Sequence, residues 1–255
     1  MPAARPNKIL TMNTEITLPP SPDTPTPTAE GDHPLKVEPM QGPVTFLTVI
    51  ENLLKQPGRI FHECRTGQLQ VPAFLLLSTL LSFSIFGLLL GSFSGGVQLW
   101  AAPLKVTLGI LTAVIICLPS LYIFSALDGL DARLGQIIAV LFSAVALAGL
   151  LLLGFAPVIW VFSTSTESLA FMGFLALIFW VIGLYFGSRL LLQAARSLGM
   201  HSTAYLKTWL TIFIIVTLQM STSLRPLLGT ADTVLPKEKR FFLQHWISHL
   251  DPVAR

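Results

Sequence analysis

The sequence predicts an all-α protein: a polytopic transmembrane helical bundle of about five spans, with interfacial amphipathic helices and a disordered N-terminal tail. Three observations predict this class. Hydrophobic residues make up 53% of the 255 residues, and charged residues make up only 11%, whereas soluble domains carry about 25% charged residues. The mean hydropathy is +0.70. Apolar runs of the length that crosses a bilayer recur along the chain.

The first segment, residues 1–43, is predicted to be a disordered proline-rich tail. It contains ten of the 18 prolines and no apolar run, so it buries too little apolar surface to offset the entropy of ordering. It also lacks the apolar core of a signal peptide. The alternative is a proline-rich ligand for a partner domain, since polyproline II needs no internal hydrogen bonds.

Residues 44–71 are predicted to form a juxtamembrane amphipathic helix followed by a linker. In "VTFLTVIENLLK", residues 44–55, the apolar side chains recur on one helical face. This stretch is too short to cross a hydrocarbon core about 30 Å thick. We expect it to lie on the membrane surface or against a partner, and to end at Pro57-Gly58.

A transmembrane domain is predicted over residues 72–223. Pro157 is expected to end or kink the third apolar run, which would otherwise overshoot the bilayer. The expected spans are residues 72–92, 104–127, 132–156, 170–194 and 205–223. The remaining segment, 224–255, is predicted to carry an interfacial helix, because Phe242, Trp246 and Leu250 recur there at helical spacing.

The basic residues predict a cytoplasmic N-terminus. The positive-inside rule counts Lys and Arg in short flanking segments, and Lys105 alone falls in the expected outer loops between helices. Five spans would, however, put Arg225, Lys237, Lys239 and Arg240 outside, which opposes this orientation. The residues on the cytoplasmic side would be Lys55, Arg59, Arg65, Arg133, Arg189, Arg196 and Lys207.

The stretch "DGLDAR", residues 128–133, begins like the signature of the CDP-alcohol phosphatidyltransferases. That resemblance implies a two-metal site built from four aspartates. The other metal-ligand positions of the family hold Ser125, Ala146 and Leu150 here, so one carboxylate of the set remains. The sequence favours a tight helical hairpin, in which Gly129 closes the second span in the left-handed conformation and Asp131 caps the third.

Two glycine pairs are predicted to be helix-packing residues. Gly87 and Gly91 stand at GxxxG spacing in the first span, as do Gly183 and Gly187 in the fourth. Such pairs form smooth patches on which another helix approaches closely. Packing within the monomer is favoured, and a self-association surface is the alternative.

Three segments carry a family resemblance: "CLPSLYIFSALDG" at 117–129, "FAPVIWVFSTS" at 155–165 and "MSTSLRPLLG" at 220–229. Together they resemble an uncharacterised family of bacterial polytopic inner-membrane proteins with a Yip-like arrangement of five helices. The resemblance covers about residues 72–250 and implies a cytoplasmic N-terminus. It implies no catalytic residues.

These observations favour a non-enzymatic membrane protein that binds or organises other membrane components, as a scaffold or an accessory subunit. No ionisable residue lies at the centre of an expected span, where charge is normally kept for ion or proton transport. We expect membrane lipids and other membrane proteins as partners, and no nucleic acid, cofactor or metal. The alternatives are a channel or carrier for a neutral or lipid-like substrate, opened at Pro119, and the phosphatidyltransferase.

Overall fold

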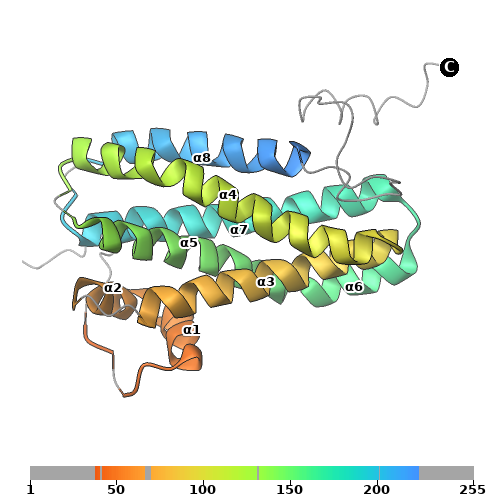
Figure 1. The fold of residues 1–255 in the computed structure, drawn as a ribbon, viewed down its shortest axis with the longest axis horizontal. Helices are drawn as coiled ribbons and strands as arrows, with labels where there is room; N and C mark the ends of the chain where they lie inside the picture. The colour runs from red at the N-terminus through yellow and green to blue at the C-terminus, as the bar shows by residue number, and fades with distance from the viewer. Residues whose placement is uncertain (1–37, 41, 67–69, 131, 201, 224–255) are drawn as a thin grey trace, which may run out of the picture. The chain divides into compact units, whose positions relative to one another are not determined.

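Helices account for nearly all of the backbone that the structure describes (Figure 1). The computed structural model describes residues 38–40, 42–66, 70–130, 132–200 and 202–223, which form eight helices and no strand. All of them belong to one structural unit, Pro34–Arg255. The predicted all-α class is therefore confirmed. The predicted tail, residues 1–43, lies almost wholly outside the described residues, as does the predicted C-terminal segment.

Four helices are long and apolar enough to cross a membrane, by length and composition. They are α3 (Gln70–Ser94), α4 (Gln98–Leu127), α5 (Leu134–Gly154) and α7 (Leu169–Ser197). The fifth predicted span corresponds to α8 (Ala204–Ser223). Within α8, the apolar stretch Ala204–Gln219 is shorter than the length that a membrane-crossing helix requires. The structure is thus consistent with a multi-pass membrane protein.

The turn between α3 and α4 is tighter than the sequence predicts. Gly95 and Gly96 adopt φ angles of +66° and +53°, a left-handed region that glycine enters without steric cost. Two such residues reverse the chain quickly, so α4 begins at Gln98 and extends through Pro103 and Pro119. Lys105 was expected in an outer loop. It instead lies inside α4 with its side chain buried.

The third apolar run breaks into two helices, as Pro157 predicts. Phe155 is both the C-cap of α5 and the N-cap of α6 (Ala156–Ser165), and the proline occupies the first turn of α6. Proline has no N–H to donate and is tolerated there. The Phe155 ring stacks on Phe179 of α7, with ring centroids 4.4 Å apart. This contact fixes the break against the neighbouring helix.

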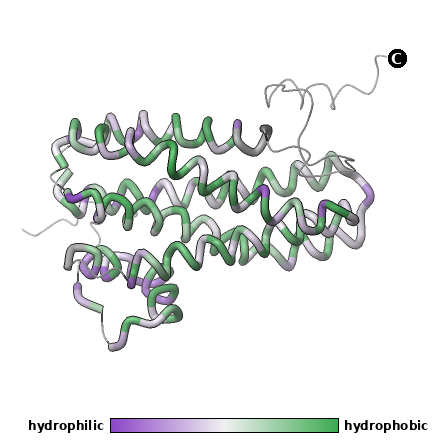
Figure 2. Tube along the Cα trace, in the orientation of Figure 1, coloured by the Kyte–Doolittle hydropathy of each residue, from purple (hydrophilic) through white to green (hydrophobic). Residues whose placement is uncertain are grey.

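The long helices pack in the spatial order α8, α4, α3, α5, α7. Helix α3 contacts both α4 and α5, while α8 lies on α4 and α7 lies on α5 (Figure 1). The long helices are mostly apolar along their length, and polar residues gather around α1, α2 and the turns (Figure 2). The α4–α5 and α7–α8 connections lie at the same end. We call this the basic end, because Arg133, Arg196 and Lys207 lie there.

The glycine pairs allow this close packing. A Cβ atom at Gly87 would lie 2.6 Å from the Cα of Pro103, and one at Gly91 would lie 2.5 Å from the carbonyl oxygen of Gln98. Both obstructing atoms are backbone atoms of α4, so α3 and α4 meet at backbone distance. On α7, a Cβ at Gly187 would lie 2.7 Å from the carbonyl oxygen of Ala144 in α5. These glycines therefore pack within the monomer.

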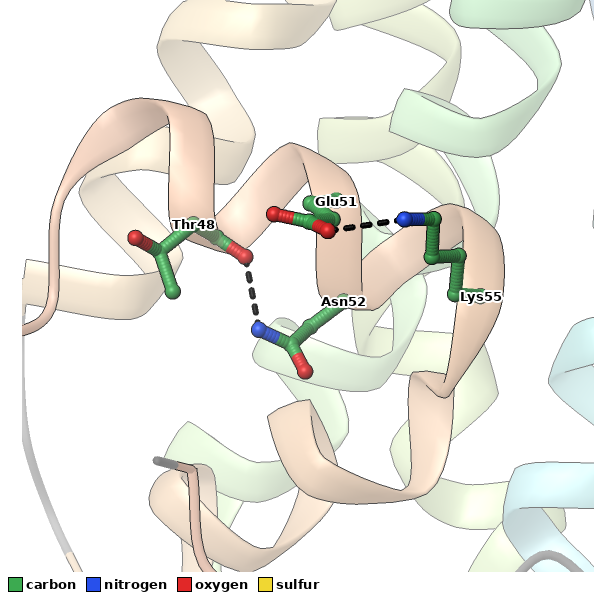
Figure 3. A network of polar contacts seen from close by, with 4 residues as sticks. All are labelled: Thr48, Glu51, Asn52 and Lys55. Carbon is green, nitrogen blue, oxygen red and sulfur yellow. Dashed lines mark hydrogen bonds and ion pairs between the residues drawn. The ribbon is translucent and has the colours of Figure 1, made fainter. Parts of the chain in front are cut away.

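The amphipathic helix expected at residues 44–55 is α1 (Phe46–Lys55), which begins after the Thr45 N-cap. Its apolar face packs on this chain's own helices, where Val49 and Leu53 are 1% exposed. The opposite face carries an ion pair between Lys55 and Glu51, 2.8 Å long (Figure 3). The lysine holds the pKa of Glu51 below its ordinary value.

A second short helix, α2 (Pro57–Thr66), replaces the predicted linker. Ile60 and Phe61 are fully buried in the core that α1 and α2 share with α3 and α5. Its sequence, "PGRIFHECRT", carries too few apolar residues to predict a helix on periodicity alone. Tertiary packing of Ile60 and Phe61 supplies the missing stabilisation.

Candidate functional site

Residues 128–130 of the DGLDAR stretch form a turn at the basic end. Gly129 adopts a φ of +83°, and its N–H donates to the carbonyl of Ala126 at 3.0 Å. The N–H of Leu130 donates to the carbonyl of Ser125, also at 3.0 Å. These two bonds define a Schellman motif, which satisfies the free carbonyls at the end of α4. Leu130 is buried at this turn.

Asp128 holds the start of a helix that is distant in sequence. Its carboxylate oxygens accept hydrogen bonds from the backbone N–H of Leu206, at 2.8 Å, and of Tyr205, at 3.4 Å. These amides belong to the first turn of α8, where backbone N–H groups have no partner within the helix. The negative charge also suits the positive end of the helix dipole. Asp128 is only 3% exposed, so this cap is buried.

The cap predicted at Asp131 falls on a residue outside the described part of the chain. The N-cap position of α5 is Arg133, whose backbone N–H donates to the Gln136 side chain at 3.1 Å. Within the residues that the structure describes, no three His, Cys, Asp or Glu side chains cluster closely enough to hold a metal ion. The carboxylate of Asp128 is instead used by backbone amides.

One further polar contact joins α8 to α4. The indole N–H of Trp209 donates to the carbonyl of Cys117 at 3.1 Å and to the hydroxyl of Ser120 at 3.0 Å. Trp209 is fully buried and its ring stacks on Phe213 at 5.2 Å. A buried indole N–H needs such a partner. The acceptors lie on either side of Pro119, so the region predicted as the opening of a channel is hydrogen-bonded to α8.

An apolar pocket lies between α5 and α7 on one side and α8 on the other. Phe83 of α3 and Ile110 of α4 complete the lining. Helices α7 and α8 make few contacts with each other, so the space between them is not closed. We call this the α7–α8 pocket, and its lining includes Ala148, Trp180, Leu184, Ser188, Leu191 and Leu210.

Polar groups are scarce in the α7–α8 pocket. Ser188 contributes the only hydroxyl of its lining, and Trp180 and Trp209 contribute indole groups. The indole nitrogen of Trp180 is buried and has no hydrogen-bond acceptor within the described part of the chain. The Phe83 ring meets the Trp180 ring edge-on, with centroids 5.6 Å apart. The chemistry that this pocket offers is therefore apolar contact with a bound group.

Sequence reasoning did not find the α7–α8 pocket. Its lining is mostly leucine, alanine and valine, which look the same in sequence as residues facing lipid. The predicted packing residues Gly183 and Gly187 lie at the α5–α7 contact beside it, and Gly187 lines it. The predicted interfacial residues Phe242, Trp246 and Leu250 lie outside the described residues.

The thiol of Cys64, in α2, has low reactivity. Burial, and to a lesser extent the charge of neighbouring Glu63, raises the pKa of Cys64 to about 12. Glu63 itself is buried and accepts a hydrogen bond from the backbone N–H of Met40 at 3.0 Å. A thiol with so high a pKa contains little of the thiolate that reacts or binds metal. We therefore place no reactive or metal-binding role at Cys64.

The fold is consistent with a multi-pass helical membrane protein, and it contains an apolar pocket between α5, α7 and α8. No family model, no curated protein and no solved structure matches the chain.

Proposed function

We propose that this chain is a non-enzymatic multi-pass membrane protein that binds another component of the membrane through the α7–α8 pocket. The observation that supports it is the pocket itself, which is apolar, lies within helices long enough to cross a bilayer, and opens where α7 and α8 make few contacts. Membrane-facing pockets of this lining select apolar partners.

The proposal includes a location and an orientation. The distribution of Lys and Arg supports a cytoplasmic basic end, because the positive-inside rule places such residues there and Arg133, Arg196 and Lys207 gather at that end. The Yip-like resemblance supports a bacterial inner membrane and remains a prediction.

Site-specific photocrosslinking in native membranes tests the binding role. A benzophenone amino acid replaces Leu184, which lines the pocket, and in a matched variant it replaces Tyr185, which is 60% exposed on the outer side of α7. We expect the Leu184 probe to capture a defined lipid or protein species that the Tyr185 probe does not capture. Identical products from the two neighbouring positions would refute the proposal.

A second candidate function is a carrier for a lipid-like substrate. The lateral mouth of the pocket favours it over an aqueous channel, because the lining offers a single hydroxyl for hydration. Transfer of a fluorescent lipid between the leaflets of vesicles that contain the purified chain tests this function. Transfer no faster than in protein-free vesicles would exclude it.

A further inference from the structure

We propose that α1 lies in the headgroup–acyl boundary of the bilayer at the basic end and contacts lipid through a second apolar sector. We call this the outer apolar sector; it consists of Phe46, Leu47, Ile50 and Leu54. The surface is separate from the α7–α8 pocket, so the inference goes beyond the proposed function. It is supported by the sectors of α1, by their continuity with α3, and by the depth of α3 at their contact.

Helix α1 has three different sectors around its axis. With about 3.6 residues per turn, Val49 and Leu53 share one side, which is buried against this chain's own helices. A second side is polar and carries the ion pair of Lys55 with Glu51 (Figure 3). Between these two sides lies the outer apolar sector, in which Leu47 is 76% exposed and Leu54 is 54% exposed. A helix at a membrane surface meets protein, water and lipid on three such sides.

The outer apolar sector continues onto α3. The Phe46 ring meets the Phe74 ring of α3 edge-on, with centroids 6.2 Å apart. Helix α3 is long and apolar enough to cross a membrane, so its exposed apolar residues face lipid in a bilayer. Beyond Phe74 these residues form one row, Leu77, Leu81, Ile85 and Leu88. A continuous exposed apolar surface of this kind marks a contact with membrane or protein, and here its larger part belongs to a candidate span.

Two aromatic residues mark the level of the bilayer on α4. Trp100 and Tyr122 are both exposed and lie on nearly the same side of the helix. The rise between them is roughly 33 Å at about 1.5 Å per residue, close to a hydrocarbon core about 30 Å thick. Trp and Tyr are enriched at membrane–water interfaces. These residues therefore indicate the two faces of the hydrocarbon core, with Tyr122 at the basic end.

Helix α3 begins at the level of Tyr122. The hydroxyls of Ser84 and Thr107 lie 3.0 Å apart, where α3 and α4 run antiparallel (Figure 1). The rise from Ser84 back to Gln70 and the rise from Thr107 forward to Tyr122 are nearly equal, roughly 21 Å and 23 Å. Phe74 is one turn, about 6 Å, deeper than Gln70. Interfacial helices bury their apolar face about 5–10 Å into the headgroup–acyl boundary, so the contact with α1 has the required depth.

The accessibility of spin labels on α1 tests this assignment. The full-length chain, with Cys64→Ala and Cys117→Ala, is placed in nanodiscs of phosphatidylcholine and phosphatidylglycerol. A nitroxide is attached at Leu54→Cys or, as the matched control, at Lys55→Cys. Oxygen concentrates among the acyl chains, whereas a nickel chelate stays in water. We expect the ratio of oxygen to nickel accessibility to be roughly fivefold higher at position 54 than at position 55.

Two results would overturn the assignment. Equal ratios at the two positions, with high nickel accessibility at both, would place the outer apolar sector in water. Low accessibility to both oxygen and nickel at position 54 would show that protein covers the sector. A short spin–spin distance between two copies, or accessibility restored by deleting residues 224–255, would then identify the covering segment. If Leu54→Cys does not fold, Leu47→Cys provides the same test.

The two proposals fail independently. The benzophenone probe at Leu184 reports on the α7–α8 pocket, whereas the nitroxide on α1 reports on the outer apolar sector. Loss of the pocket-specific product would overturn the proposed function and leave the position of α1 in the bilayer intact.

Discussion

The contact between α3 and α4 makes a quantitative prediction about Gly87. In Gly87→Ala, the new Cβ would lie 2.6 Å from the Cα of Pro103, whereas carbon atoms pack at about 3.5–4.0 Å. The two helices must therefore separate locally by about 1 Å. Adding a methyl group to a packed interior costs about 1–3 kcal/mol. The upper half of that range applies, because the obstructing atom is backbone and cannot rotate away.

Alanine offsets part of this loss, since it favours the helix over glycine by about 1 kcal/mol. The expected net destabilisation is about 1–2 kcal/mol, which is roughly a 5–30-fold decrease in the ratio of folded to unfolded protein. The control is Gly135→Ala in α5, where a Cβ would meet nothing within 4 Å. This variant should be stabilised by up to about 1 kcal/mol.

Unfolding of both variants by SDS titration in bicelles, compared with the unsubstituted chain, measures these free energies. A Gly87→Ala variant as stable as the parent protein would refute the reasoning. So would an equal loss in Gly135→Ala, because the destabilisation would then come from the loss of glycine itself and not from the helix contact.

Three further predictions follow from the polar contacts. Asp128→Ala removes the buried cap of α8. Hydrogen-exchange protection of the first-turn amides of α8 should fall about tenfold, which corresponds to about 1.4 kcal/mol. Glu167→Ala, at an exposed position, should leave the protection of these amides unchanged. Trp209→Phe keeps an aromatic ring but replaces the indole by a smaller phenyl group and loses two hydrogen bonds. It should destabilise the protein by about 1–2 kcal/mol in the SDS titration. The control Trp100→Phe, at a position 77% exposed, should be neutral. Burial raises the pKa of Cys64 from 9.0 to about 12, so the thiol loses its proton at a lower pH in the unfolded chain than in the folded protein. The stability of the fold should therefore fall as the pH rises above about 9. Cys64→Ala should weaken this pH dependence, and an identical pH profile in the variant would contradict the assignment.

The long apolar helices were predictable because their composition alone requires a membrane environment. The bounds of α5, α7 and α8 differ from the predicted spans by at most three residues. The Pro157 break and the Gly129 turn followed from backbone chemistry, since proline lacks an N–H and glycine tolerates positive φ. Local rules of this kind need no knowledge of the rest of the chain.

The features that were missed depend on tertiary contacts. Helix α2 forms from a largely polar sequence because Ile60 and Phe61 are buried in the core of the bundle. The partner of Asp128 lies 78 residues away at Leu206, and no local pattern predicts it. Within long helices that are apolar on every side, periodicity no longer separates the inner face from the outer. The pocket was hidden for that reason.

The capping of α8 by Asp128 has a consequence for the order in which the chain matures. The carboxylate is synthesised 78 residues before the Leu206 amide that binds it. At about 5–20 residues per second, this separation is roughly 4–16 s of translation. During that interval the Asp128 carboxylate at the end of α4 lacks the amides of α8 that bind it. Docking of α8, which follows the other described helices in the sequence, is therefore required before this charge pairing can form.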